Sequence, residues 1–265
     1  MPTTADIEPV VEAAFRRAFF NLSAYLRSVL KSLKTEQGIL ESDAFNMSRI
    51  DQTIRSLRVQ MDVLGYRQAI QTELQSLANL HQQILDQGAA MDLPQEFSQE
   101  SKMAVRMLLI GAETDMLQLG NSVAGTLGDV LRRSILGGTN FSDLVMDIEG
   151  KIESGMSRAV TLAVSTMHSF NSAVRVRHAE ENGIEWFAYL GPDDEITREW
   201  CDHWVGRRGR LEDFENTAYR WSRGKQPGPV RAWRGGYNCR HELVPVFGKA
   251  LKDYPVGPRA NRTDD

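Results

Sequence analysis

Cysteine is scarce in this sequence. Two cysteines, Cys201 and Cys239, occur in 265 residues, a length that can build a hydrophobic core without disulfide staples. No basic segment precedes an apolar run at the N-terminus, and the longest uncharged run, Ala159–Val174, is too polar to cross a bilayer. We therefore expect a soluble protein made in a reducing cytoplasm, with no membrane partner, in which cysteines are usually thiols or metal ligands rather than a disulfide.

Sequence motifs of the common enzyme classes are also missing. The chain contains no P-loop, no G-x-S-x-G elbow, no H-E-x-x-H pair and no dinucleotide-binding fingerprint. Cys201 and His203 could be considered a nucleophile and a base, but such pairs normally come together from distant positions and need an oxyanion site, which we cannot locate. The sequence therefore favours a protein that is not an enzyme.

Tryptophan is absent, and proline is rare, in the first two thirds of the chain. Residues 1–183 contain three prolines and no tryptophan, and apolar residues recur there at three- and four-residue steps, as in the seam from Ile50 to Leu64. The spacing predicts long helices that pack as antiparallel neighbours in an elongated bundle, with the apolar stripes forming the core or an interface with another subunit. The expected helices cover residues 7–33, 46–85, 98–136, 141–152 and 157–181.

The composition changes at Ile184. All five tryptophans and six of the nine prolines lie beyond it, which predicts a second unit with short elements and ordered loops. We expect strands at 184–191 and 242–247, a short helix within 196–206, and a long loop or ragged hairpin between them. The predicted fold is mainly α with a small α+β C-terminal unit, divided into a helical interaction region (1–153), the α+β unit (154–248) and a tail (249–265).

The two cysteines and a histidine form a candidate metal site. On a strand, Cys239 and His241 would point to the same face about 7 Å apart, and Cys201 would supply a third ligand from the preceding helix. His203 is a possible fourth ligand, although residues i and i+2 diverge on a regular helix. The pattern leaves three alternatives open: a structural zinc, buried or neighbouring free thiols, and a disulfide.

A basic segment within the second unit is a candidate nucleic-acid surface. From Thr197 onward the chain carries 14 Lys and Arg against 9 Asp and Glu, whereas the preceding part is acidic. Arginines interleaved with aromatic residues suit phosphate contacts and base stacking, but they also suit cation–π and ion-pair contacts inside the fold. The candidate residues are Arg207, Arg208, Arg210, Arg231 and Arg234.

Residues 150–247 resemble the minor head proteins of tailed bacteriophages typified by the head morphogenesis protein F of phage Mu. The shared order is a helix with an Arg, a Thr and an Asn, a strand with an aromatic residue, an Asp–Thr–Arg turn before a Cys and a Gly, and a closing Cys-Arg-His followed by a proline. The matching positions are Arg158, Thr166, Asn171, Trp186, Asp194, Thr197, Arg198, Cys201, Gly206, Gly235, Gly236, Asn238, Cys239, Arg240, His241 and Pro245.

The resemblance implies a virion component without established chemistry of its own. Such a protein would lie in the capsid interior or at the portal vertex after assembly in the host cytoplasm, and would act in head assembly, DNA packaging or DNA delivery. Its partners would be the portal, major capsid or scaffolding protein, and packaged DNA, with self-association through the bundle as a further possibility. Many members have a second cysteine where this chain has Trp204 and a histidine where it has Gly236, so only Cys201, Cys239 and His241 remain as ligands. Two other classes stay open: a virion-carried enzyme or toxin-like effector, and a nucleic-acid-binding module.

Overall fold

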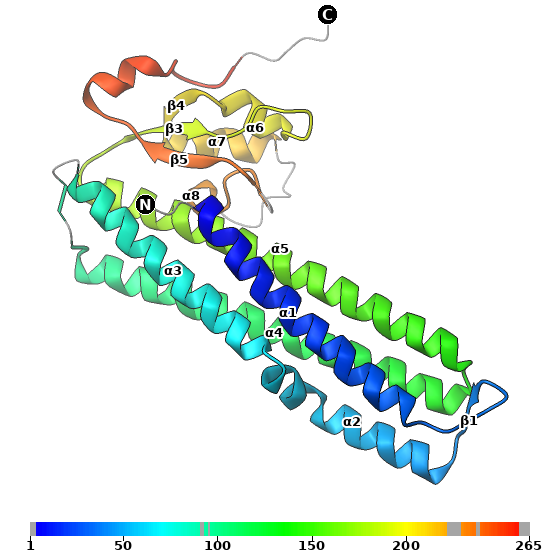
Figure 1. Cartoon of the computed structure of the whole chain (residues 1–265). Helices are drawn as coiled ribbons and strands as arrows, with labels where there is room; N and C mark the ends of the chain where they lie inside the picture. Colours follow the sequence, from blue (N-terminus) through cyan, green and yellow to red (C-terminus); the bar gives the residue numbers. More distant parts are fainter. Residues whose placement is uncertain (1–3, 91–92, 95, 222–228, 237–238, 260–265) are drawn as a thin grey trace, which may run out of the picture. The chain divides into compact units, whose positions relative to one another are not determined.

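Long helices make up most of the chain (Figure 1). The computed structural model describes residues 4–90, 93–94, 96–221, 229–236 and 239–259. The prediction of a mainly α protein with a small α+β unit near the C-terminus is confirmed. The helices are α1 (Thr4–Lys31), α2 (Ala44–Val63), α3 (Tyr66–Ala89), α4 (Gln99–Gly137), α5 (Phe141–Glu181), α6 (Glu199–Trp204), α7 (Leu211–Trp221) and α8 (Val230–Trp233), followed by a 3-10 helix, η1 (Gly248–Asp253). The strands are β1 (Thr35–Glu36), β2 (Ile39–Leu40), β3 (Trp186–Leu190), β4 (Arg207–Arg210) and β5 (Glu242–Pro245).

The chain divides into two compact units. The helical unit consists of residues 5–76 and 110–163, and the C-terminal unit consists of residues 77–109 and 164–265 with the first four residues. The sequence-based boundary after residue 153 therefore falls inside α5, and α3, α4 and α5 each contribute to both units. Within the described residues, no helix is both long and apolar enough to span a membrane.

Aromatic packing organises the core of the helical unit. Tyr66 is buried, its hydroxyl donates to the carbonyl oxygen of Met116 at 2.8 Å, and its ring meets Phe15 and Phe19 edge-on at 5.7 and 5.9 Å. Edge-on aromatic pairs of this kind add to the free energy gained by burial. The residues of the predicted seam that are buried on α2 are Ile50, Leu57 and Met61.

Two helix boundaries differ from the sequence prediction. The segment expected to be one helix over 46–85 is interrupted, because α2 ends at Val63 and Gly65 adopts a positive φ of 113° before α3 begins. The two helices expected at 141–152 and 157–181 are one continuous helix, α5. Gly155 does not break it: a Cβ there would lie 3.0 Å from both Phe19 and Val123, so this glycine permits close packing.

The C-terminal unit contains a three-stranded antiparallel sheet with the order β4-β3-β5. Phe187 and Tyr189, which alternate along β3, are buried in a core with residues of α6, α7 and the end of α5. The segment after α6, expected to be a long loop or a ragged hairpin, contains β4, which pairs antiparallel with β3, and the helices α7 and α8. Residues 222–228 of this segment lie outside the described residues. The expected tail is also bound to the fold, since the backbone N–H of Arg259 donates to the His203 carbonyl oxygen at 2.7 Å.

Candidate metal site

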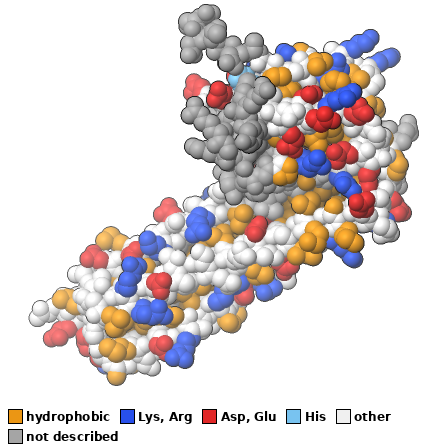
Figure 2. Space-filling model, turned by 180° about the vertical axis from the view of Figure 1, so that it is seen from behind, with side chains coloured by type: hydrophobic (Ala, Val, Ile, Leu, Met, Phe, Trp, Pro, Cys, Tyr) orange, Lys and Arg blue, Asp and Glu red, His pale blue; other side chains and the backbone are white. Residues whose placement is uncertain are grey.

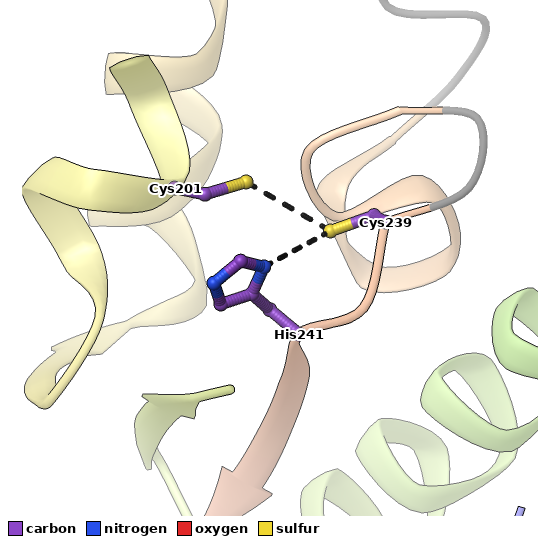
Figure 3. Close-up of side chains that lie close together, drawn as sticks. All are labelled: Cys201, Cys239 and His241. Carbon is purple, nitrogen blue, oxygen red and sulfur yellow. Dashed lines mark hydrogen bonds between the residues drawn. The ribbon is translucent and has the colours of Figure 1, made fainter. Parts of the chain in front are cut away.

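Two separate pieces of the C-terminal unit, α6 and the segment before β5, bring the candidate ligands together (Figure 3). Cys201 lies on α6, Cys239 lies in the loop that leads to β5, and His241 immediately precedes that strand. The three side chains are almost completely excluded from solvent, with exposed fractions of 1–2%. One sulfur therefore comes from a helix and the other two ligand atoms come from the approach to a strand.

Two of the three distances between the ligand atoms are close to the edges of a tetrahedral metal site. The two Sγ atoms are 3.8 Å apart, Cys239 Sγ lies 3.7 Å from His241 Nδ1, and all three ligand atoms lie within 4.8 Å of one another. In a tetrahedral site with metal–sulfur bonds of about 2.3 Å and metal–nitrogen bonds of about 2.0 Å, the corresponding edges are about 3.5–3.8 Å. Cys201, Cys239 and His241 therefore form a group that could hold a metal ion.

The histidine is oriented for coordination through Nδ1. Its Nε2 lies 2.8 Å from the carbonyl oxygen of Pro192, which can only accept a hydrogen bond, so Nε2 carries the proton. In the neutral ring, the lone pair of Nδ1 then faces the sulfur of Cys239. Metal-binding histidines commonly donate their other ring N–H to a carbonyl or carboxylate, which holds the tautomer and the ring orientation. Gly191 allows this fit, because a Cβ there would lie 2.5 Å from the His241 ring.

Hydrogen-bond donors surround the two sulfurs. The Tyr189 hydroxyl lies 3.3 Å from Cys201 Sγ and 3.2 Å from Cys239 Sγ, and the backbone N–H of Gly235 donates to Cys239 Sγ at 3.4 Å. Burial is the main reason why the pKa of Tyr189 lies well above its ordinary value, so the hydroxyl keeps its proton. Donors of this kind favour the thiolate form that a metal requires.

The two thiols are electrostatically unequal. The pKa of Cys239 lies below its ordinary value, chiefly because the Cys239 thiolate accepts a hydrogen bond from Cys201. The pKa of Cys201 is raised by the same hydrogen bond and by burial. Of the two sulfurs, Cys239 is therefore the one that ionises first.

A turn between β3 and α6 supports the site from outside. Arg240, located between the two ligands of the loop, forms a bidentate pair with Asp194 at 2.6 and 2.7 Å, and this pair lowers the pKa of Asp194. The Thr197 hydroxyl lies within hydrogen-bonding distance of both Asp194 and the carbonyl oxygen of Pro192. The same carbonyl oxygen accepts the hydrogen bond from the His241 ring. The ligand loop is thereby tied to the turn by an ion pair and by the histidine itself.

His203, the possible fourth ligand, does not belong to the converging group in the described part of the chain. It is buried on α6, but two residues along a helix point in directions about 200° apart, so it cannot face the same point as Cys201. Tyr189 is the neighbour of the sulfurs that sequence reasoning missed. Its alternation with Phe187 on a strand predicts only that it faces the core, and nothing local indicates that its hydroxyl meets both cysteines.

The five arginines proposed to bind nucleic acid each have a partner within the chain. The guanidinium carbons of Arg208 and Arg210 lie 5.2 and 5.5 Å from the ring centroid of Trp186. Arg210 also forms an ion pair with Glu185. The remaining contacts are those of Arg207 with the Val256 and Gly257 carbonyls, Arg231 with Glu180, and the buried Arg234 with the His168 carbonyl. On the face shown in Figure 2, basic and acidic side chains are interspersed. These arginines therefore take part in internal packing, whatever else they contact.

Comparisons with known proteins returned no match: no protein-family model, no curated protein and no solved structure is similar to this chain. The chemistry of the site must therefore be argued from its geometry. The buried group of two thiols and one imidazole could hold a metal ion through three ligands.

Proposed function

We propose that this protein is a structural minor component of a tailed-bacteriophage head, associated with the portal or the head interior and acting in assembly, DNA packaging or DNA delivery. The proposal rests on the order of residues shared with the phage minor head proteins. The observation that carries it is that matched residues of the turn and of the closing segment, which lie far apart in the sequence, contact one another in space. The order of the residues along the sequence does not by itself require these contacts.

These contacts join two parts of the shared pattern, the turn before α6 and the segment before β5. Arg198 donates to the Gly235 carbonyl oxygen at 2.9 Å, and Arg240 pairs with Asp194. Asn171 on α5 donates at 3.1 Å to Glu242, which is not a matched position. Cys201 and Cys239 meet at 3.8 Å, and Gly206, with a φ of 72°, ends the segment after α6 in a conformation suited to glycine. Asn238, which also belongs to the pattern, lies outside the described residues. Matched residues thus connect the turn and α6 with the segment that leads to β5.

The metal that we propose for Cys201, Cys239 and His241 is a structural zinc. Thiolate and imidazole ligands in tetrahedral spacing suit Zn²⁺, and burial of all three ligands suits a site that holds a fold rather than one that binds substrate. When bound, the ion would supply cross-links between α6 and the loop before β5. Within the chain, Pro192 orients the histidine and Gly235 donates to one of the sulfurs.

The helical unit is proposed to dock against the portal, capsid or scaffolding protein, or against a second copy of the chain. It carries exposed apolar side chains, among them Phe20 with 73% of its surface accessible and Met146 with 63%. A groove of about 510 Å³ is lined by Phe19, Phe20, Ile152 and Met156 and flanked by arginines and glutamates. Exposed apolar surface with a charged rim is typical of protein–protein contact sites.

Quantitative protein composition of purified phage particles and of assembly intermediates tests the proposal. We expect the chain in heads that contain portal, at a constant low ratio to it. Its absence from both mature heads and intermediates would overturn the proposal. Binding to DNA with a steep dependence on salt, without incorporation into heads, would instead favour the nucleic-acid-binding alternative.

A further inference from the structure

Tyr189 occupies an unusual position at the candidate metal site. It projects from β3, has no accessible surface, and places its hydroxyl 3.3 Å from one sulfur and 3.2 Å from the other. A buried tyrosine hydroxyl normally finds an oxygen or nitrogen partner, whereas both contacts recorded for this hydroxyl are with sulfur. When both cysteines are metal-bound thiolates, which cannot donate, the hydroxyl is either a metal ligand itself or a hydrogen-bond donor to the sulfurs.

The orientation of the rings argues against direct coordination of the same ion by Tyr189. The rings of Tyr189 and His241 are stacked and nearly parallel, at an angle of 7°, with centroids 5.1 Å apart. A metal bound at Nδ1 lies in the plane of the imidazole. The phenol oxygen lies in the plane of the other ring, outside the plane in which the Nδ1 lone pair points.

We propose that the Tyr189 hydroxyl donates its hydrogen bond to the metal-bound thiolates of Cys201 and Cys239 and thereby sets the affinity of the site for its metal. This inference rests on the structural zinc proposed above. Tyr189 is a positioning residue: it does not touch the ion and acts through the sulfurs. Outer-shell partners of this type typically account for 10- to 100-fold in metal affinity.

The two sulfurs depend on Tyr189 to different extents. Cys239 Sγ also receives the backbone N–H of Gly235 at 3.4 Å and therefore retains a donor when the hydroxyl is removed. For Cys201 Sγ, the contacts recorded among the described residues are those with Tyr189 and with the other sulfur. Once both cysteines are thiolates, neither can donate to the other, so Tyr189 becomes the donor on which Cys201 relies.

The variant Tyr189→Phe removes the hydroxyl and keeps the ring. The ring packs against Trp200 at 5.0 Å and Phe214 at 6.1 Å, and phenylalanine preserves both contacts. We expect the affinity for Zn²⁺, measured by competition with a chromophoric chelator, to fall by about 10- to 100-fold. In the Co²⁺-substituted protein, the sulfur-to-metal charge-transfer band should move to longer wavelength, because a thiolate without its hydrogen bond is easier to oxidise.

Trp200→Phe is the matched control for a packing defect. It disturbs the same aromatic cluster and removes a tryptophan N–H that lies 3.3 Å from Thr217, but it leaves the hydroxyl on the sulfurs. We expect it to lower the melting temperature while the position of the charge-transfer band stays unchanged. Equal band shifts in both variants would overturn the proposal, because packing would then explain the effect.

The experiment separates this inference from the zinc proposal. A wild-type protein that takes up neither Zn²⁺ nor Co²⁺ overturns both. A wild-type protein that binds, with a Tyr189→Phe variant of equal affinity and identical band, overturns only the role of Tyr189. If the variant does not fold, the wild-type protein loaded with an NMR-active cadmium isotope decides: a slowly exchanging hydroxyl proton coupled to cadmium supports the hydrogen bond, and its absence overturns it.

Discussion

Gly235 lies so close to Cys201 that a Cβ at Gly235 would overlap the Cys201 sulfur, and it would also lie 3.2 Å from the sulfur of Cys239. The Gly-Gly pair before the second cysteine is therefore explained by close approach of backbone to the two sulfurs. The first glycine leaves room for the cysteine pair, and Gly236 turns the chain with a φ of 99°.

Gly235→Ala should destabilise the C-terminal unit by about 1–3 kcal/mol, because one added methyl group would push the sulfurs apart in a filled core. Thermal and denaturant unfolding measure the change. Gly150→Ala is the control: Gly150 lies in α5 with nothing within 4 Å of the added Cβ, so we expect a gain of about 0.5–1 kcal/mol. A neutral effect at Gly235 would show that the sulfurs do not lie where the structure places them.

Protein purified without chelator should contain one zinc per chain by elemental analysis, and Cys239→Ser should abolish it. The variant should then lose amide-exchange protection over residues 184–247, because the free energy of metal binding is also free energy of folding for a small unit. If the site holds no metal, the same substitution should lower the free energy of unfolding by only about 1–2 kcal/mol.

His203→Gln is the control for the zinc measurement. His203 lies close in sequence to Cys201 but outside the converging group, so the variant should keep its zinc. Zinc-free wild-type protein would contradict the metal assignment and leave a packed thiol pair.

Leu57→Asp should lower the free energy of unfolding of the helical unit by about 3 kcal/mol or more, because Leu57 has 1% of its surface accessible and a buried carboxylate without a partner is costly. Val59, two residues further along α2, is 62% accessible, and Val59→Asp should change the stability by less than about 0.5 kcal/mol. Similar effects of the two substitutions would show that the predicted seam does not face the core.

Ionisation of Glu73 should lower the free energy of unfolding as the pH rises from mildly acidic to mildly alkaline values. This carboxyl is buried on α3, and neither of its oxygens has a hydrogen-bond partner among the residues that the structure describes. Burial, followed by the charge of Asp115, raises its pKa from 4.5 to about 8. The folded state holds the proton more tightly than the unfolded state. The stabilisation is therefore fully present below pH about 4.5 and is lost as the pH rises to about 8, with a limiting slope of about 1.4 kcal/mol per pH unit.

Urea unfolding at a series of pH values measures the contribution of Glu73. Glu73→Gln should flatten the pH dependence, whereas replacing the exposed Asp86 of the same helix by Asn should leave it unchanged. A wild-type protein whose stability is constant from pH 5 to pH 8 would show that Glu73 ionises without penalty.

The sequence by itself determined the features that depend on local spacing. Apolar residues at helical intervals predicted α1 and α4 closely, and the change of composition at Ile184 marked the start of the α+β part. Cys201, Cys239 and His241 could be chosen as candidates because they are the residue types that bind soft metals. These predictions needed only periodicity and side-chain chemistry.

Only the tertiary structure decided the features that depend on residues distant in the chain. Gly155 continues a helix because Phe19 and Val123 need its space, and the tail is bound because Arg259 reaches the backbone of His203. Tyr189 became part of the site because β3 places its hydroxyl between sulfurs 12 and 50 residues away. Such contacts arise when separate elements pack into one dense core, and no pattern within a single segment encodes which atoms will meet there.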